Sequence, residues 1–89
     1  MLKNSSVLIT GGTGSFGKTL VNFFVKNKSY KFSKIVVFSR DELKQHEMRE
    51  SISLKGKPNL RFLIGDIRDY SRLEFALKDI DFVIHAAAL

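Results

Sequence analysis

The sequence predicts an α/β fold in which helices are wound onto both faces of a parallel sheet. Two observations predict it. Four short apolar runs rich in β-branched residues alternate with stretches that have the apolar spacing of helices. Glycine follows the first and third of these runs, and no long repeat or low-complexity tract interrupts the alternation. Such alternation is typical of βαβ units, whose right-handed crossovers build a parallel sheet.

The first βα unit occupies the front of the chain. Residues 7–10 form a continuous apolar run that ends at Gly11 and Gly12, which suits a strand buried on both faces. A helix is expected behind it, up to residue 27, because four apolar residues recur at three- and four-residue spacing, as one buried face requires. These residues are Phe16, Leu20, Phe23 and Phe24.

The remaining elements repeat this order. Strands are expected at residues 35–38, 60–64 and 82–84, and helices at residues 40–51 and 71–78, with a breaker segment at residues 55–59. The apolar contacts expected from the second helix are Leu43, Met48 and Ile52, and those from the third are Leu73, Phe75, Ala76 and Leu77. Parallel strands with right-handed crossovers then give a doubly wound sheet of about four strands in the order 3-2-1-4, with three helices.

The turn after the first strand carries the main binding motif. Gly12, Gly14 and Gly17 satisfy G-x-G-x-x-G, and Gly11 precedes them. Free N–H groups at a helix N-terminus attract a pyrophosphate, and glycine lets it approach the backbone. Gly11 would allow the tight turn, Gly14 the close approach, and Gly17 the packing of helix on sheet. The motif predicts a Rossmann-type dinucleotide site, and the alternative is a glycine-rich turn without a ligand.

The residues after the second strand distinguish NAD from NADP. An NAD site places an acidic residue there, about 20 residues beyond the glycines, on the ribose 2′-hydroxyl. This sequence has Ser39 and Arg40 instead, and a guanidinium can hold a 2′-phosphate bidentately. Lys44 could add charge, whereas Asp41 could serve an NAD ribose if Arg40 pointed to solvent. We favour NADP.

Two further segments follow strands at the edge where open α/β sheets bind ligands. Asp66 could accept a hydrogen bond from the adenine amine while Ile67 packs on the ring, although Asp66 also suits a capping or turn role. After the fourth strand, Ala86 and Ala87 leave room for the ribose and nicotinamide, or simply allow close packing. These residues complete the expected cofactor site.

Composition restricts the function classes. The chain has no cysteine, which excludes disulfides and thiolate metal sites, and no apolar run near its start has signal-peptide length, so we expect a cytoplasmic protein without membrane contact. The net charge of +6 invites a nucleic-acid interpretation. The clustered lysines, however, lie in a polar connector without any nucleic-acid-binding motif, and a solvated loop explains them. They are Lys26, Lys28, Lys31 and Lys34.

Histidine catalysis and metal binding are not favoured. His85 ends the fourth strand without a serine, cysteine or metal-ligand partner, which favours a hydrogen-bonded core histidine over a catalyst. His46 falls on the exposed side of the second helix. Turn chemistry explains Asp66 and Asp69 better than metal ligation does, so we expect no metal site.

These motifs resemble the extended short-chain dehydrogenase/reductases. More narrowly, they are similar to the inverting UDP-N-acetylglucosamine 4,6-dehydratases of the CapD-like polysaccharide biosynthesis group. The resemblance covers nearly the whole chain, and the Ser-Arg-Asp-Glu-Leu-Lys stretch that starts at Ser39 is its most specific part. It rests on residues 8–18, 39–45, 62–69, 72–73 and 83–89.

The resemblance implies NADP contacts at many of the positions that the chemistry selects. These are Thr13, Gly14, Ser15, Phe16, Ser39, Arg40, Asp41, Glu42, Leu43, Lys44, Asp66, Ile67 and Ala86. Gly11, Gly17 and Ala87 are added from the turn and small-residue arguments above. Because the chain starts just before the first strand, it looks like the soluble branch of the group.

The resemblance also implies an activity. Members take a hydride from C4 of a UDP-sugar, eliminate water across C5 and C6, and return the hydride to C6 with inversion at C5, for bacterial surface glycans or flagellin glycosylation. We expect residues 1–89 to be the front part of such a Rossmann domain, in a protein that is a homo-oligomer when complete. The group's Thr-Asp-Lys segment and Tyr-x-x-x-Lys pair are absent here, so we expect no turnover by this chain alone. Alternatives are a sugar epimerase of the same superfamily and a non-catalytic NADP-binding module.

Overall fold

The computed structural model describes residues 5–11, 13–26, 32–52 and 60–86. Within these ranges the strands are β1 (Ser6–Thr10), β2 (Lys34–Ser39), β3 (Leu60–Ile64) and β4 (Phe82–His85), and the helices are α1 (Ser15–Lys26), α2 (Glu42–Ser51) and α3 (Tyr70–Ala76). The strands form one parallel sheet in the order β3-β2-β1-β4. The expected fold class and strand order are therefore confirmed.

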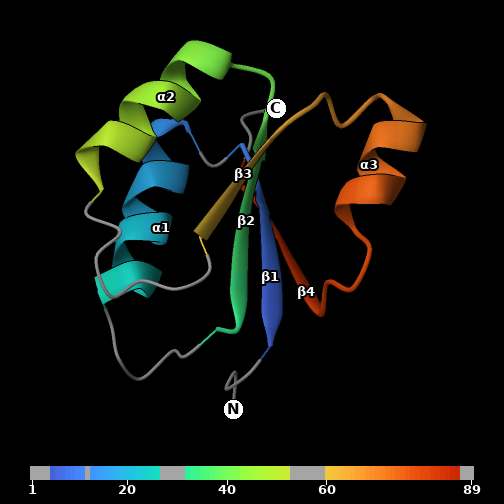
Figure 1. Ribbon diagram of the computed structural model, residues 1–89, viewed down its shortest axis with the longest axis horizontal. Coiled ribbons are helices and arrows are strands. Elements are labelled where there is room, and N and C mark those ends of the chain that lie inside the picture. The colour runs from blue at the N-terminus through green and yellow to red at the C-terminus, as the bar shows by residue number, and fades with distance from the viewer. Residues whose placement is uncertain (1–4, 12, 27–31, 53–59, 87–89) are drawn as a thin grey trace.

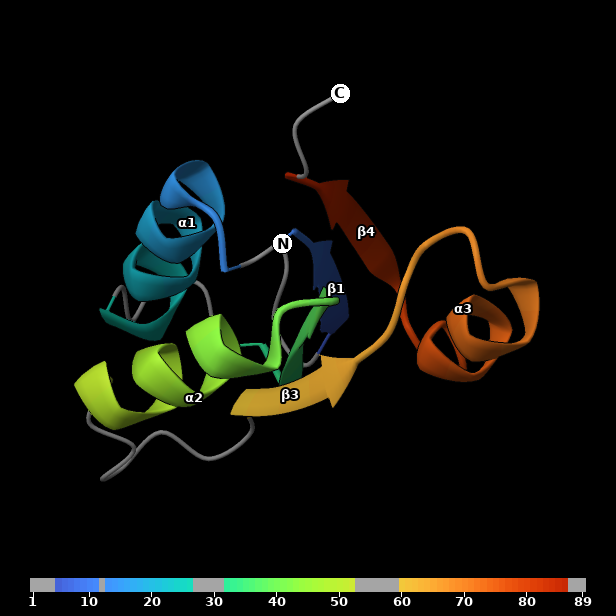
Figure 2. The same ribbon diagram turned by 90° about the horizontal axis from the view of Figure 1, so that it is seen from above.

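Helices cover both faces of the sheet. Helices α1 and α2 lie on one face and α3 on the other, as Figures 1 and 2 show. Alternate residues of β1 and β2 serve the two sides, so that Val7 and Ile9 join the core under α1 and α2, while Leu8 joins the core under α3. The central strands β1 and β2 are buried on both faces, as their unbroken apolar sequences predict.

The buried face of α1 differs from the expected one. Gly17, Val21 and Phe24 are buried, whereas Phe16 is 60% exposed and Phe23 is 47% exposed. The expectation was therefore wrong for Phe16 and Phe23 and was confirmed for Phe24. Gly17, Val21 and Phe24 follow one another at four- and three-residue spacing and form the buried stripe, and Phe16 and Phe23 fall outside it.

Two apolar contacts expected from the other helices were also wrong. Leu43 is 66% exposed, while Met48 and Ile52 form the buried contacts of the α2 segment. Phe75 on α3 is 61% exposed, and Ala76 is the buried residue there. Each helix buries only one or two of its residues, so Leu43 and Phe75 lie outside the buried set.

Aspartates set the starts of α2 and α3. The Asp41 carboxylate accepts a hydrogen bond from the Lys44 backbone N–H at 2.9 Å, so α2 begins at Glu42 rather than at residue 40. Asp69 accepts in the same way from the Arg72 N–H at 3.2 Å, and α3 begins at Tyr70. Asp69 thus has the local capping role that its sequence context favoured.

Some expectations concern parts of the chain that the structure does not describe. The connector with Lys28 and Lys31, the breaker at residues 55–59, Gly12 and Ala87 all lie outside the described residues. Among the helices that are described, none combines the length and the apolar content that crossing a bilayer needs.

Candidate dinucleotide-binding site

The parallel register brings the ends of the four strands to one edge of the sheet. Thr10 of β1 pairs with Phe38 of β2 on one side and with His85 of β4 on the other. Ser39 of β2 pairs in turn with Ile64 of β3. The segments that follow these strands, which hold the expected site residues, are therefore neighbours along the carboxyl edge, where α/β sheets bind ligands.

Backbone hydrogen bonds of Gly11 hold the turn between β1 and α1. Gly11 has a φ of 67°, in the left-handed region that favours glycine. Its N–H donates to the Phe38 carbonyl at 2.9 Å, and its carbonyl accepts from the Gly14 N–H at 3.1 Å. The chain thus leaves the strand by the tight turn that the sequence predicts, and α1 starts at Ser15 directly after it.

Gly14 has no packing reason to be glycine. A Cβ built there would meet the Gly11 carbonyl oxygen at 3.5 Å, an ordinary contact. Gly65 is different, because a Cβ there would lie 2.6 Å from the Phe38 ring and 2.7 Å from the Arg72 side chain. The chain's own packing therefore requires Gly65 to be glycine, whereas it would accept a Cβ at Gly14.

The first turn of α1 can receive an anion. It contains no acidic residue, and the first N–H groups of a helix have no partner within the helix. Thr13, just before this turn, is buried, while Ser15 and Phe16 are exposed. Gly17 is buried against the sheet, as expected. The expected residues of the turn are thus at the start of the helix, at the carboxyl edge.

The segment after β2 presents charged side chains to solvent. Arg40 has a side chain that is 70% exposed, and Glu42, Leu43 and Lys44 are exposed as well. The Asp41 carboxylate, the candidate for an NAD ribose, is engaged by the helix cap described above. Arg40 thus has the solvent exposure under which Asp41 could serve an NAD ribose, but the Asp41 carboxylate already accepts the Lys44 N–H. Of the two side chains, Arg40 is therefore the more available for a ligand.

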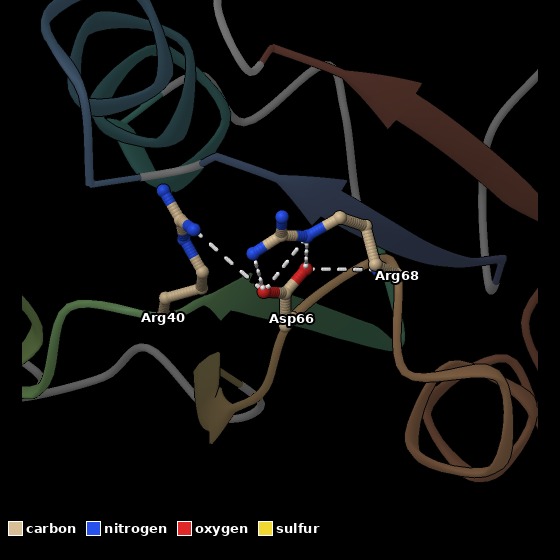
Figure 3. A network of polar contacts seen from close by, with 3 residues as sticks. All are labelled: Arg40, Asp66 and Arg68. Atoms are coloured by element: carbon tan, nitrogen blue, oxygen red, sulfur yellow. Dashed lines mark hydrogen bonds and ion pairs between the residues drawn. The ribbon is translucent and has the colours of Figure 1, made fainter.

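Asp66 connects β3 to β2 through an ion-pair network. Its carboxylate lies 3.6 Å from the Arg40 guanidinium and 2.7 Å from that of Arg68 (Figure 3). It also accepts the Arg68 backbone N–H at 2.8 Å. The hydrogen bonds from Arg68, helped by the nearby positive charge of Arg40, hold the pKa of the Asp66 carboxyl far below its usual range. The carboxylate is therefore ionised at neutral pH.

The other expected residues complete the edge. Ile67 beside Asp66 is 42% exposed, so its side chain offers an apolar surface. Ala86 is partly buried, and its N–H donates to the Thr10 carbonyl at 2.9 Å.

The neighbouring His85 is hydrogen-bonded through Nδ1 to the Thr10 hydroxyl, as expected, but it is an exposed residue rather than a core one. The difference arises because β4 lies at the edge of the described sheet. His46 is exposed, as expected, beside Glu50 at 3.9 Å.

Two residues that position the site were not selected from the sequence. Gln45 is 2% exposed, and its amide donates to the Ser39 hydroxyl at 3.0 Å and to the Leu63 carbonyl at 2.9 Å. Arg68 was quoted only as part of a motif, yet it makes the shortest contacts to Asp66. A glutamine at a buried helical position, three residues before Met48, was the available signal for Gln45. No sequence signal distinguished Arg68 from other surface arginines.

The fold and this edge define a Rossmann-type α/β protein of the nucleotide-binding class. The chain belongs to the polysaccharide biosynthesis protein family, whose model matches residues 7–89. The expected family is thereby confirmed.

Comparison with known proteins connects the chain to sugar-nucleotide enzymes. It is 53% identical over 89 residues to the inverting UDP-N-acetylglucosamine 4,6-dehydratase of Campylobacter jejuni. The aligned region covers 100% of this chain and 25% of that enzyme. It is 47% identical over 90 residues to a UDP-glucose 4-epimerase of Rickettsia bellii, covering 100% of this chain and 26% of the epimerase. The chain thus spans about a quarter of the length of the curated relatives that it matches.

A solved structure has the same fold. The crystal structure of dTDP-glucose 4,6-dehydratase from Bacillus anthracis in complex with NAD superposes with a TM-score of 0.77 at 25% identity, over 96% of this chain and 27% of that one. That relative is a dehydratase with a dinucleotide bound.

Proposed function

We propose that this chain binds NADP along the carboxyl edge of its sheet. The diphosphate would lie on the turn and the start of α1, at Gly11, Thr13, Gly14, Ser15, Phe16 and Gly17. The 2′-phosphate would bind the segment after β2, at Ser39, Arg40, Asp41, Glu42, Leu43 and Lys44. The adenine would lie at Asp66 and Ile67, and the nicotinamide half near Ala86 and Ala87.

The shape and charge of this edge support the proposal. The chain's own packing does not require glycine at position 14, but the close approach of a diphosphate to the backbone there would require it. The first turn of α1 has no acidic side chain to repel an anion. Ile67 offers an exposed apolar surface next to the Asp66 carboxylate, as an adenine ring needs.

The observation that carries the choice of NADP is the exposed guanidinium of Arg40 at the end of β2. Its side chain is 70% exposed, so it can turn to a ligand, and the Asp41 carboxylate beside it is engaged in capping α2. A guanidinium favours a 2′-phosphate, while an acid at this place would favour the 2′-hydroxyl of NAD. The relative from Bacillus anthracis has NAD bound, so the choice between the two needs a direct test.

Calorimetric titration of the chain with NADP and with NAD is that test. We expect NADP to bind more tightly, and Arg40→Ala to remove the preference by weakening NADP about tenfold or more, as loss of a bidentate phosphate contact does. Arg61→Ala is the matched control, since Arg61 is an exposed arginine near the start of β3, away from the carboxyl edge. Equal affinity of the unchanged chain for both dinucleotides would contradict the choice of NADP.

For the whole protein we propose a nucleotide-sugar 4,6-dehydratase that acts on a UDP-sugar such as UDP-N-acetylglucosamine, in the synthesis of surface glycans. The identity to the Campylobacter enzyme supports it. When bound, the dinucleotide supplies the hydride acceptor and donor that oxidation at C4 and reduction at C6 of a sugar require. The second candidate is a sugar 4-epimerase, favoured by the identity to the Rickettsia relative. A non-catalytic NADP-binding module is the third.

Replacement of the matching segment in each relative separates these candidates. Residues 1–89 would replace the corresponding quarter of the Campylobacter dehydratase and, separately, of the Rickettsia epimerase. We expect the dehydratase chimera to retain conversion of UDP-N-acetylglucosamine and the epimerase chimera to lose most of its activity. Activity in the epimerase chimera alone would favour the second candidate, and no activity in either folded chimera would favour the binding module.

A further inference from the structure

Asp66 is held unequally by its two arginines (Figure 3). Arg68 donates from Nη2 to Oδ2 at 2.7 Å and from Nε to Oδ1 at 3.1 Å, and its backbone N–H reaches Oδ1 at 2.8 Å. Arg40 comes no nearer to Oδ2 than 3.6 Å, which is an ion pair without a hydrogen bond. The carboxylate is therefore hydrogen-bonded to Arg68, and it interacts with Arg40 only as an ion pair.

This inequality matters if a phosphate arrives at Arg40. Asp66 lies within ion-pair distance of the Arg40 guanidinium, so a phosphate bound there would lie close to a carboxylate of the same sign. Like charges at such distances oppose binding unless a cation compensates for them. The cation that compensates for the Asp66 charge is Arg68, which lies at hydrogen-bond distance from the carboxylate. Its side chain is 77% exposed.

We propose that Arg68 is a specificity-determining residue for NADP that acts through Asp66. It neutralises and orients the carboxylate, so that Arg40 can leave Asp66 for the 2′-phosphate without exposing an uncompensated negative charge beside it. NAD has no phosphate at that position, so its binding does not depend on this compensation. The inference rests on the proposed NADP site and adds a positioning residue to it.

The first test compares NADP and NAD affinities of the chain carrying Arg68→Gln, which removes the charge and keeps a side-chain donor. We expect the ratio of NADP to NAD affinity to fall about three- to fivefold, the size of one exposed ion pair. Arg68→Lys restores the charge and should recover most of the ratio. Arg61→Ala, which removes an exposed arginine on β3, should leave the ratio unchanged. Circular dichroism and urea unfolding would verify that each variant is folded.

The second test repeats Arg68→Gln in an Asp66→Asn background. Because no carboxylate then needs neutralising, Arg68→Gln should no longer change the ratio. A change that persists in this background would mean that Arg68 acts on the phosphate directly and would overturn the proposal. An equal loss of NADP and NAD affinity in the single variant would overturn it too, since Arg68 would then only support the adenine. If the unchanged chain binds neither dinucleotide, the proposed function itself fails, and that result is distinguishable from both.

Discussion

The side-chain amide of Gln45 donates a hydrogen bond to the hydroxyl of Ser39 at 3.0 Å, and thereby joins α2 to the end of β2. The same nitrogen donates to the Leu63 carbonyl at 2.9 Å on β3. One buried amide therefore connects α2, β2 and β3, near the strand ends that Arg40 and Asp66 follow. The distance between these two charged residues depends on how the ends of β2 and β3 are held, so Gln45 supports the geometry of the candidate site.

Replacement of Gln45 by alanine should destabilise the chain. It leaves the buried Ser39 hydroxyl and the partly buried Leu63 carbonyl without this donor, at a cost of about 1–3 kcal/mol in the free energy of unfolding. Urea denaturation followed by circular dichroism measures it. His46→Ala, on the exposed face of the same helix, is the control and should change the free energy of unfolding by less than about 0.5 kcal/mol. Equal changes in the free energy of unfolding for the two variants would show that the hydrogen bonds of Gln45 do not stabilise the chain.

Alanine at the two glycines should separate binding from stability. Gly14→Ala should change the unfolding midpoint little, because its Cβ meets only an ordinary contact, and should weaken dinucleotide binding by obstructing the diphosphate. Gly65→Ala should lower stability by about 1–3 kcal/mol, because its Cβ would be forced against the Phe38 ring. Calorimetry and urea unfolding on both variants test this pair. Undiminished binding by a folded Gly14→Ala variant would argue against a diphosphate at the turn.

Serine at position 41 should show whether Asp41 caps a helix or binds a ribose. Serine can accept the Lys44 N–H as aspartate does, so Asp41→Ser should keep the free energy of unfolding within about 0.5 kcal/mol, while Asp41→Ala should lose about 1 kcal/mol. Affinity for NAD should be the same for Asp41→Ser as for the unchanged chain. A selective loss of NAD affinity would indicate that the carboxylate serves the ribose after all.

The Asp66 carboxyl should contribute to the pH dependence of stability. Hydrogen bonds from Arg68 lower its folded pKa below the unfolded value, so its contribution is fully present above about pH 5 and is lost as the pH falls through the acid range. Urea unfolding between about pH 5 and pH 2 should therefore show a shallower loss of stability in Asp66→Asn than in the unchanged chain.

A carboxyl-carbon NMR titration tests the cause of that low pKa. In Arg68→Ala the pKa of Asp66 should rise toward the ordinary aspartate value, because its hydrogen-bond donor and nearest positive charge are gone. An unchanged pKa in that variant would mean that Arg68 does not hold the carboxylate in solution.

Backbone features were predictable from the sequence, because they depend on residue type in a local pattern. Unbroken apolar runs fixed β1 and β2, and the glycine motif predicted the turn at which Gly11 adopts a positive φ. The place of Arg40 directly after β2 followed from strand position alone, whereas its exposure did not. Parallel order then placed these features at one edge, as the register between Thr10 and Phe38 shows.

Side-chain relationships were not predictable in the same way. Apolar spacing suggested that Phe16 and Phe23 are buried, but the buried stripe of α1 runs through Gly17, Val21 and Phe24. The tie made by Gln45 and the hold of Arg68 on Asp66 join atoms from different elements or depend on rotamers. Sequence spacing carries no information on either, so these relationships needed coordinates.

The position of β1 between β2 and β4 has a consequence for how the chain is made. The Ser6 N–H of β1 donates to the Asp81 carboxylate at 2.8 Å, across a separation of 75 residues. At synthesis rates of about 5 to 20 residues per second, the ribosome needs roughly 4 to 15 seconds to span that interval. Although β1 is made before the other three described strands, it is thus among the last of them to be fully paired, and until β4 is made it presents an open apolar edge that a chaperone can bind.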